Sequence, residues 1–156
     1  MKEKNGEHPF GDIGQQISAG LFLIVWVVDS FLLRRTTFLA AHVPIGVRMA
    51  ILVLTLITAF CLFRSGHVVV SHDRRPGGLV TTGAFEHIRH PLYLASMLAY
   101  LGVAVSTLSI FSLAMFVVIF LFHDYIATYE EQLLEAKFGE EYRIYRAKTG
   151  KWIPGL

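Results

Sequence analysis

Charge and cysteine are both scarce in this sequence. Lys and Arg number 14 and Asp and Glu number 12, so 17% of the residues are charged and the net charge is +2. A balance this close to neutral gives no reason to expect a nucleic-acid partner. Cys61 is the single cysteine, which excludes an intrachain disulfide and a cysteine metal cluster. The spacings of His67, His72 and His87 match no compact ligand pattern, so we predict no metal site.

Hydrophobic residues make up 54% of the chain and the mean hydropathy is +0.53, which is typical of an integral membrane protein. Four apolar runs are bounded by charged or turn residues, and we expect each run to form a spanning helix. The predicted spans cover about 17–33, 44–63, 91–105 and 108–127. The sequence therefore predicts an all-α, four-span transmembrane helix bundle that forms a single domain over residues 1–156.

The run Leu92–Phe122 holds 31 residues without a charge. As one straight helix it would be about 47 Å long, well beyond the roughly 30 Å hydrocarbon core of a bilayer, so we expect a hairpin. We predict the turn at Ser106-Thr107, just after Gly102. The two ends of a hairpin lie on the same face of the membrane, so Arg89-His90-Pro91 and Glu130-Glu131 should face each other.

The lysines and arginines predict the orientation, because basic residues in short loops stay on the cytoplasmic side. With four spans, eleven basic residues share one face with both termini and the central loop, against three on the other face. The three are Arg34, Arg35 and Arg48. We therefore expect a multi-pass protein with both termini, the central loop and the acidic pair in the cytoplasm.

The segments outside the spans divide into a lead-in, a central loop and a C-terminal cap. Met1–Gln16 is polar and receives no functional assignment. The central loop, Arg64–Arg89, is long and contains apolar residues to bury, which favours a functional loop. The fourth helix meets no breaker before Gly139, and Glu140–Lys148 predicts a second, interfacial helix. Asp29 lies near the outer end of the first span with basic residues close by, and we interpret it as structural.

Four short motifs occur in order over the second half of the chain. They are Leu79-Val80-Thr81-Thr82-Gly83-Ala84-Phe85, Arg89-His90-Pro91-Leu92-Tyr93, Glu130-Glu131 and Phe138-Gly139-Glu140-Glu141-Tyr142. On these motifs and their spacing, the sequence resembles the isoprenylcysteine carboxyl methyltransferase family, which is grouped with membrane phospholipid N-methyltransferases. The resemblance covers roughly Gly66–Pro154, and the first two spans match only as hydrophobic segments.

The resemblance implies an integral membrane enzyme that transfers a methyl group from S-adenosylmethionine to a lipophilic, membrane-resident acceptor. It also implies a cytoplasmic cap, made by the central loop and the terminal helix, over the cofactor site. The cofactor contacts it implies are Gly77, Gly78, Leu79, Val80, Phe85, His90, Pro91, Leu92, Tyr93, Glu130 and Glu131. Adjacent residues of a helix point about 100° apart, and we favour Glu130 over Glu131 for the cofactor. No catalytic residue is predicted, because the sulfonium is already an activated leaving group.

The predicted acceptor-side positions are Arg89 and Ile126. Where the family commonly has an arginine assigned to the carboxylate of the acceptor, this chain has Ile126, and an aliphatic side chain makes no charged bidentate contact. Arg89, Arg143 or Arg146 could compensate from elsewhere in the fold. We therefore expect acceptors without a carboxylate, such as a lipid amine or a lipophilic thiol, to be preferred.

Several other functions stay open on the sequence alone. Within the methyltransferases, the chain could be an isoprenylcysteine carboxyl methyltransferase, a phospholipid N-methyltransferase or a thiol methyltransferase. Outside them, a membrane reductase would use NADPH in the same pocket, and a non-enzymatic membrane scaffold would have kept the fold and lost the acceptor chemistry. The acceptor and the oligomeric state are left undefined by these residues.

Overall fold

The computed structural model describes residues 11–72 and 78–155. In these ranges every regular element is a helix, which confirms the all-α class for the described part of the chain. In chain order the elements are α1 (Gly11–Val27), η1 (Val28–Leu33), η2 (Phe38–Ala41), α2 (Ile45–His72), η3 (Gly83–Glu86), α3 (Pro91–Thr107), α4 (Ile110–Phe138) and α5 (Glu140–Lys148). Here η1 is a π-helical turn that continues α1, and η2 and η3 are single 3₁₀ turns.

Three helical stretches are long and apolar enough to cross a membrane, which indicates an integral membrane protein. They are Ile13–Leu33, Ile45–Val68 and Ile110–Phe138. The third helix, α3, is apolar but has 17 residues, so it is only about 26 Å long. Four membrane crossings therefore stay a prediction, because α3 falls slightly short of a full hydrocarbon core.

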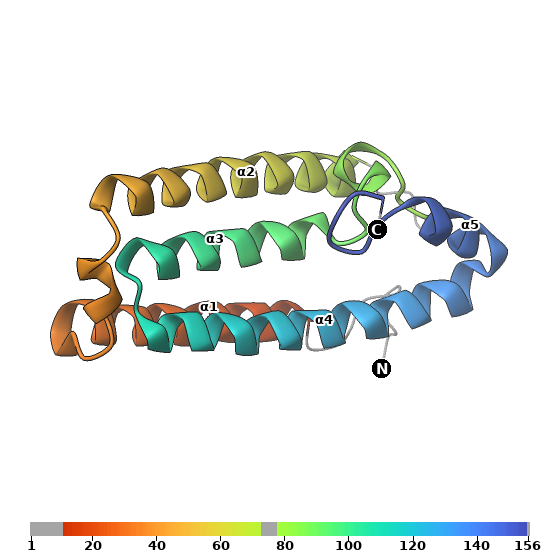
Figure 1. Ribbon diagram of the computed structural model, residues 1–156. Coiled ribbons are helices and arrows are strands. Elements are labelled where there is room, and N and C mark those ends of the chain that lie inside the picture. Colours follow the sequence, from red (N-terminus) through yellow and green to blue (C-terminus); the bar gives the residue numbers. More distant parts are fainter. Residues whose placement is uncertain (1–10, 73–77, 156) are drawn as a thin grey trace.

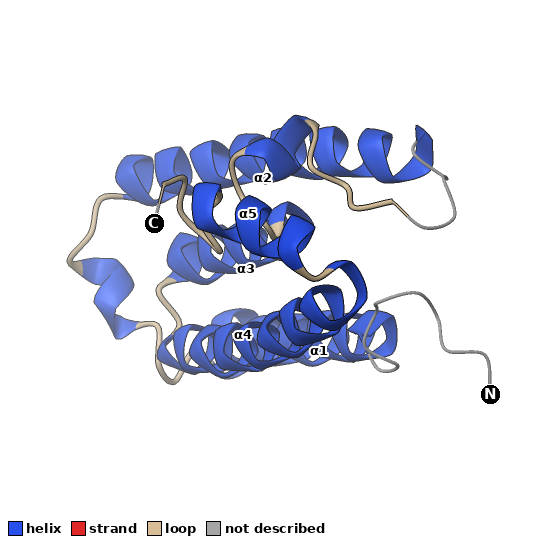
Figure 2. Cartoon of the chain, turned by 90° about the vertical axis from the view of Figure 1, so that its right-hand side faces the viewer, coloured by secondary structure: helices blue, strands red, loops and turns tan. Residues whose placement is uncertain are grey.

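The helix α3 lies between α2 on one side and the α1–α4 pair on the other (Figures 1 and 2). Phe22 of α1, Ala104 of α3 and Ile119 of α4 meet in one buried cluster. The approach of α2 to α3 depends on small residues. A Cβ at Gly102 would lie 2.0 Å from Thr55 Oγ1, so a larger residue would push the two helices apart.

The α3–α4 hairpin forms as predicted, but its turn lies at Leu108-Ser109 rather than at Ser106-Thr107. Ser109 is the reason, because its hydroxyl caps α4 by accepting a hydrogen bond from the Ser112 backbone N–H at 3.1 Å. Ser106 stays helical, with its hydroxyl donating to the Val103 carbonyl at 2.7 Å. The prediction was wrong by about two residues because it did not recognise the capping serine.

Two helices extend beyond the predicted spans outside the hairpin. Helix α1 begins at Gly11, inside the predicted lead-in, and α2 continues to His72, through the first part of the predicted loop Arg64–Arg89. Packing explains both extensions. A Cβ at Gly14 would lie 2.8 Å from the Phe122 ring, and one at Gly66 would lie 2.9 Å from the Leu92 side chain. Each glycine lets a helix end lie tightly against the hairpin, which outweighs the poor helix propensity of glycine.

At the turn end of the hairpin, Asp29 is buried, with 2% of its surface exposed. The Ser109 hydroxyl donates to its carboxylate at 2.6 Å, and the Thr36 hydroxyl donates to the same oxygen. Arg34 reaches Asp29 only through its backbone N–H, 2.8 Å from the Asp29 carbonyl, while its side chain is exposed. Asp29 is therefore built into the turn as a structural group, with hydroxyl partners instead of the expected basic ones.

Candidate functional site

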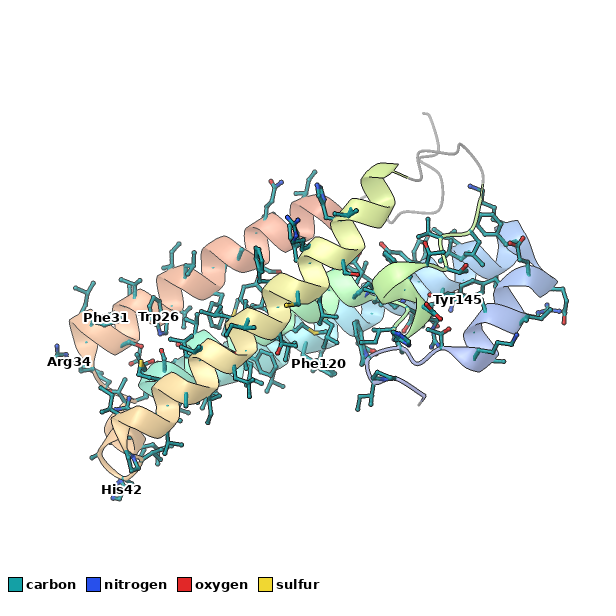
Figure 3. All side chains as sticks on the ribbon, turned by 90° about the horizontal axis from the view of Figure 1, so that it is seen from above. Trp26, Phe31, Arg34, His42, Phe120 and Tyr145 are labelled. Carbon is teal, nitrogen blue, oxygen red and sulfur yellow. The ribbon has the colours of Figure 1, made fainter. Side chains whose placement is uncertain are left out.

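The other end of the hairpin brings the Arg-His-Pro motif against the glutamate pair. Arg89 Nε lies 2.8 Å from Glu131 Oε1, and His90 Nε2 lies 3.2 Å from the same oxygen. The Tyr93 hydroxyl donates to Glu130 Oε1 at 2.7 Å. The predicted meeting of the two motifs is confirmed. Tyr145, which bonds to the loop at this end, lies at the opposite end of the molecule from Trp26, Phe31, Arg34 and His42 (Figure 3).

Local sequence positions the first of these motifs. Pro91 is the first residue of α3, where a missing N–H costs nothing, and His90 immediately precedes the helix. The His90 ring makes no capping bond to the helix, so it is available for the glutamates. Its Nε2 contacts Glu131 at 3.2 Å and its Nδ1 lies 3.9 Å from Glu130. One imidazole therefore lies between the two carboxylates.

The two glutamates have different surroundings. The Glu131 side chain is 7% exposed, and its two oxygens approach Arg89, His90 and, at 3.9 Å, the Arg146 guanidinium. The Glu130 side chain is 14% exposed and accepts its hydrogen bond from a phenol. Glu131 is thus bound into a charged cluster that joins three segments of the chain, while Glu130 lies at its edge beside Tyr93.

The C-terminal segment closes over the central loop at this end (Figure 2). Arg89 donates its backbone N–H to the Gly150 carbonyl at 2.9 Å, and its guanidinium donates to the Arg146 carbonyl at 3.2 Å and to the Thr149 carbonyl. The Tyr145 hydroxyl donates to the Phe85 carbonyl at 2.6 Å. Because its guanidinium already has these partners, the predicted contact of Arg89 with an acceptor stays a prediction.

The last described residues return to α4. Asp124 Oδ1 accepts from Lys151 Nζ at 2.6 Å and from the Trp152 indole at 2.9 Å. The Trp152 ring centroid lies 5.6 Å from that of His90 and 6.2 Å from that of Phe120. The tail therefore packs against α4 and against the His90 ring.

Two tyrosines of the cap are held neutral by burial. Loss of solvent raises the pKa of Tyr145 to about 12. Burial also raises the pKa of Tyr142 above its usual value, and the nearby Glu131 carboxylate adds to the effect. The Tyr142 side chain is completely buried, and its hydroxyl has no hydrogen-bond partner. Both phenols remain protonated at physiological pH, with Tyr145 as a hydrogen-bond donor and Tyr142 as a packing group.

Beside Tyr93 lies a histidine that the sequence analysis did not single out. His123 is completely buried, and its ring meets the Tyr93 ring edge to face, with centroids 5.4 Å apart. Ile126 is buried nearby with 1% exposure, and it packs with Tyr93 and Ala127. The signal was available, because His123 precedes Glu130 by seven residues and a spacing of seven returns to the same helix face.

The remaining predicted cofactor residues differ in burial where the structure describes them. Gly77 lies outside the described residues. Gly78 is exposed, Leu79, Val80, Phe85 and Leu92 are half-buried, and Pro91 is buried. Their contribution to cofactor binding stays a prediction. Across the described ranges, no group of three or more His, Cys, Asp or Glu residues could hold a metal ion.

Comparison with known proteins matches this half of the chain. Residues 65–141 match the family model described as phospholipid methyltransferase. The chain is also 33% identical over 89 residues to protein-S-isoprenylcysteine O-methyltransferase of Schizosaccharomyces pombe. That match covers 56% of this chain and 38% of the relative, so well under half of the relative is represented. The segment that the family model matches contains the whole α3–α4 hairpin with its facing Arg-His-Pro and Glu-Glu motifs, so the chain is similar to the phospholipid methyltransferase family in the part that forms this site.

Proposed function

We propose that the protein transfers a methyl group from S-adenosylmethionine to a lipophilic acceptor in the membrane. The observation that carries the proposal is the cluster of His90, Tyr93, Glu130 and Glu131 at the loop end of the hairpin. This cluster falls within the segment that matches the methyltransferase family. It joins a carboxylate, an imidazole and a phenol beside the start of an apolar helix, where a polar cofactor and a lipid-soluble acceptor can both arrive.

The residues present fit this cofactor, which has a sulfonium, an ammonium group, a carboxylate and a flat adenine. Glu130 accepts a hydrogen bond from the Tyr93 hydroxyl, and a carboxylate in that position suits the ammonium group or the ribose hydroxyls. The N-terminus of α3 at Pro91 favours the carboxylate of the cofactor. The half-buried Leu79, Phe85 and Leu92 offer apolar surface for the adenine.

When bound, the sulfonium supplies a methyl group that is already activated for displacement. The chain therefore has to position the two reactants and exclude water, and positioning alone can lower a barrier by about 7–11 kcal/mol. Tyr93 and His90 orient Glu130, and Trp152 packs on the same rings. Glu131 and Arg89 fasten α4 to the loop and to the C-terminal segment, so they hold the cap in place over the site.

Within this function we favour an amine or thiol acceptor over a carboxylate. Ile126 is 1% exposed and surrounded by Tyr93 and Ala127, so the position offers no cation to an ionised acceptor. An unpaired charge buried there would be costly. Phospholipid N-methylation and thiol methylation both meet this condition, and the phospholipid methyltransferase family match favours the first.

The functional experiment uses purified protein in detergent. Calorimetry with S-adenosylhomocysteine and with NADPH should show binding of the first compound and none of the second. Binding of NADPH alone would favour a reductase, and binding of neither would favour a scaffold. Radiolabelled-methyl transfer to a phospholipid amine, a lipophilic thiol and a prenylcysteine acid then ranks the acceptors, and we expect the acid to be poorest.

We further propose that α3 crosses the membrane as the third of four spans, which puts the site and both termini in the cytoplasm. The eleven-to-three distribution of basic residues supports this orientation. In a variant without Cys61, single cysteines at the exposed Glu86 and Ile110, which lie on either side of α3 in the chain, should be labelled from opposite sides of a sealed vesicle. Labelling of both from the same side would contradict the four-span arrangement.

A further inference from the structure

The His123 imidazole is a buried polar group to which the proposed cofactor site gives no role. It lies within the apolar helix α4, and none of its surface is exposed. Its Nδ1 lies 2.8 Å from the Ile119 carbonyl oxygen, whereas its Nε2 has no hydrogen-bond partner. Buried polar atoms are nearly always paired, and ionisable residues inside a span usually have a function. We therefore expect His123 Nε2 to pair with a group of a ligand.

The paired nitrogen determines what that group must be. A carbonyl oxygen only accepts hydrogen bonds, so Nδ1 carries the hydrogen and donates it to Ile119. In the neutral ring Nε2 then holds a lone pair. In the absence of a ligand, a second proton would create an unpaired cation in a fully buried position, which is strongly disfavoured. Nε2 is consequently a hydrogen-bond acceptor, and only a group that donates a hydrogen can pair with it.

Tyr93 connects this nitrogen to the proposed cofactor site. Its hydroxyl donates to Glu130 at 2.7 Å, while its ring lies edge to face with His123. His123 is seven residues before Glu130, which is about 10 Å along the helix axis toward the membrane interior. A lipophilic acceptor that enters from the bilayer would reach the His123 side of Tyr93 first, while the glutamates lie on the loop side.

We propose that His123 Nε2 binds the reacting group of the methyl acceptor and takes its proton, and that this group is a thiol or an amine. The inference rests on the proposed methyltransferase function and names its substrate class. As the acceptor sulfur or nitrogen forms its bond to the methyl carbon, the methyl–sulfur bond of the donor breaks and its electron pair stays on that sulfur. The hydrogen of the acceptor passes to Nε2 as the sulfonium loses its positive charge, so the imidazolium that forms leaves the net charge of the site unchanged. A carboxylate would instead bring its own lone pairs against Nε2.

The test compares His123→Phe and His123→Gln with wild-type protein in two measurements. Phenylalanine keeps the aromatic packing and removes the lone pair, whereas the glutamine amide oxygen can accept a hydrogen bond without serving as a base. His42→Ala, at an exposed histidine of the opposite end, is the matched control. Affinity for S-adenosylhomocysteine should stay within about twofold for all variants. Because a positioned base typically contributes about 10²- to 10⁴-fold, kcat for a lipophilic thiol or a lipid amine should fall by that factor in His123→Phe.

His123→Gln should separate binding from proton transfer, with a KM near that of wild type and a strongly lowered kcat. A second readout does not depend on turnover. With S-adenosylhomocysteine bound, addition of the thiol or amine acceptor should shift the nitrogen-15 resonance of His123 Nε2, and a prenylcysteine acid should not.

Unchanged kcat in His123→Phe would overturn the proposal. If that variant fails to fold, it also loses S-adenosylhomocysteine binding, and unchanged kcat in His123→Gln then overturns the proposal instead. Faster methylation of a prenylcysteine acid than of either other acceptor would overturn the assigned substrate class. Failure of wild-type protein to bind S-adenosylhomocysteine would count against the methyltransferase function itself, which is a separate outcome.

Discussion

The two ends of the α3–α4 hairpin both contain buried carboxylates, but they use them differently. At the turn end, Asp29 accepts hydrogen bonds from the hydroxyls of Thr36 and Ser109, which belong to the connections that close the bundle. At the loop end, Glu131 is bound to a guanidinium and an imidazole, and Glu130 is bonded to a phenol beside them.

The difference distinguishes a buried carboxylate with a structural role, at the turn end, from one with a proposed ligand-binding role, at the loop end. A carboxylate surrounded by short hydroxyl side chains has its lone pairs satisfied and contributes to the turn. A pair of adjacent glutamates, which point to different sides of one helix, can divide the roles. Glu131 is bound to Arg89 and His90, and we propose that Glu130, beside Tyr93, contacts the cofactor. We expect mutations at the three carboxylates to separate stability from cofactor binding.

The largest effect is expected for Glu131→Ala. The substitution leaves Arg89, whose side chain is 11% exposed, without its carboxylate partner. Breaking a buried ion pair from one side typically costs about 3–5 kcal/mol of folding free energy. Thermal unfolding in detergent should show a lower Tm and an earlier loss of the C-terminal segment. Glu130→Ala is the control, and an equal loss of stability in both variants would erase the distinction between the two glutamates.

Glu130→Gln should reduce ligand affinity with little change in Tm. Loss of a charged hydrogen bond to the cofactor would weaken S-adenosylhomocysteine binding by roughly 1.5–3 kcal/mol, or about 10- to 150-fold. His90 and Tyr93 variants should behave in the same direction, since both side chains contact the Glu130 carboxylate. Calorimetry measures the effect. Unaltered affinity in Glu130→Gln combined with a large loss in Glu131→Gln would mean that the cofactor lies on the other side of α4.

Asp29→Asn tests the turn end. Its amide presents a donor to hydroxyls that now donate to a carboxylate, so about 1–2 kcal/mol of stability should be lost. Affinity for S-adenosylhomocysteine should equal that of wild type, because Asp29 and the Glu130 site lie at opposite ends of the hairpin. Thermal unfolding measures the change in stability, and calorimetry on the same sample measures the affinity for S-adenosylhomocysteine. Weaker cofactor binding would show that the two ends are energetically coupled.

The smallest effect is expected for Arg143→Ala. Arg143 Nε lies 2.8 Å from Glu135 Oε1, but the Arg143 side chain is 62% exposed. Exposed ion pairs contribute little because water and salt screen them. Neither Tm nor affinity should change measurably. A clear drop in Tm would show that this surface pair holds α5 in place, in addition to the buried Arg89–Glu131 pair.

The sequence by itself determined the helical class, the hairpin and the pairing of its two motifs. A long uncharged run fixes these features, because it exceeds one membrane crossing and has to return. Gly139 and the segment Glu140–Lys148 likewise predicted the end of α4 and the whole of α5. These are local signals, in which chain length, composition and turn chemistry act over a few residues.

Only the tertiary structure decided which groups the carboxylates bind and where the helices end. Gly14 and Gly66 allow helical ends that local propensity disfavours, since both lie tightly against the hairpin. The hydroxyl partners of Asp29 and the orphaned Nε2 of His123 likewise depend on residues far apart in the chain. Such contacts come from packing across helices, and the hydrophobic pattern that predicts each helix carries little information about its rotation against the others.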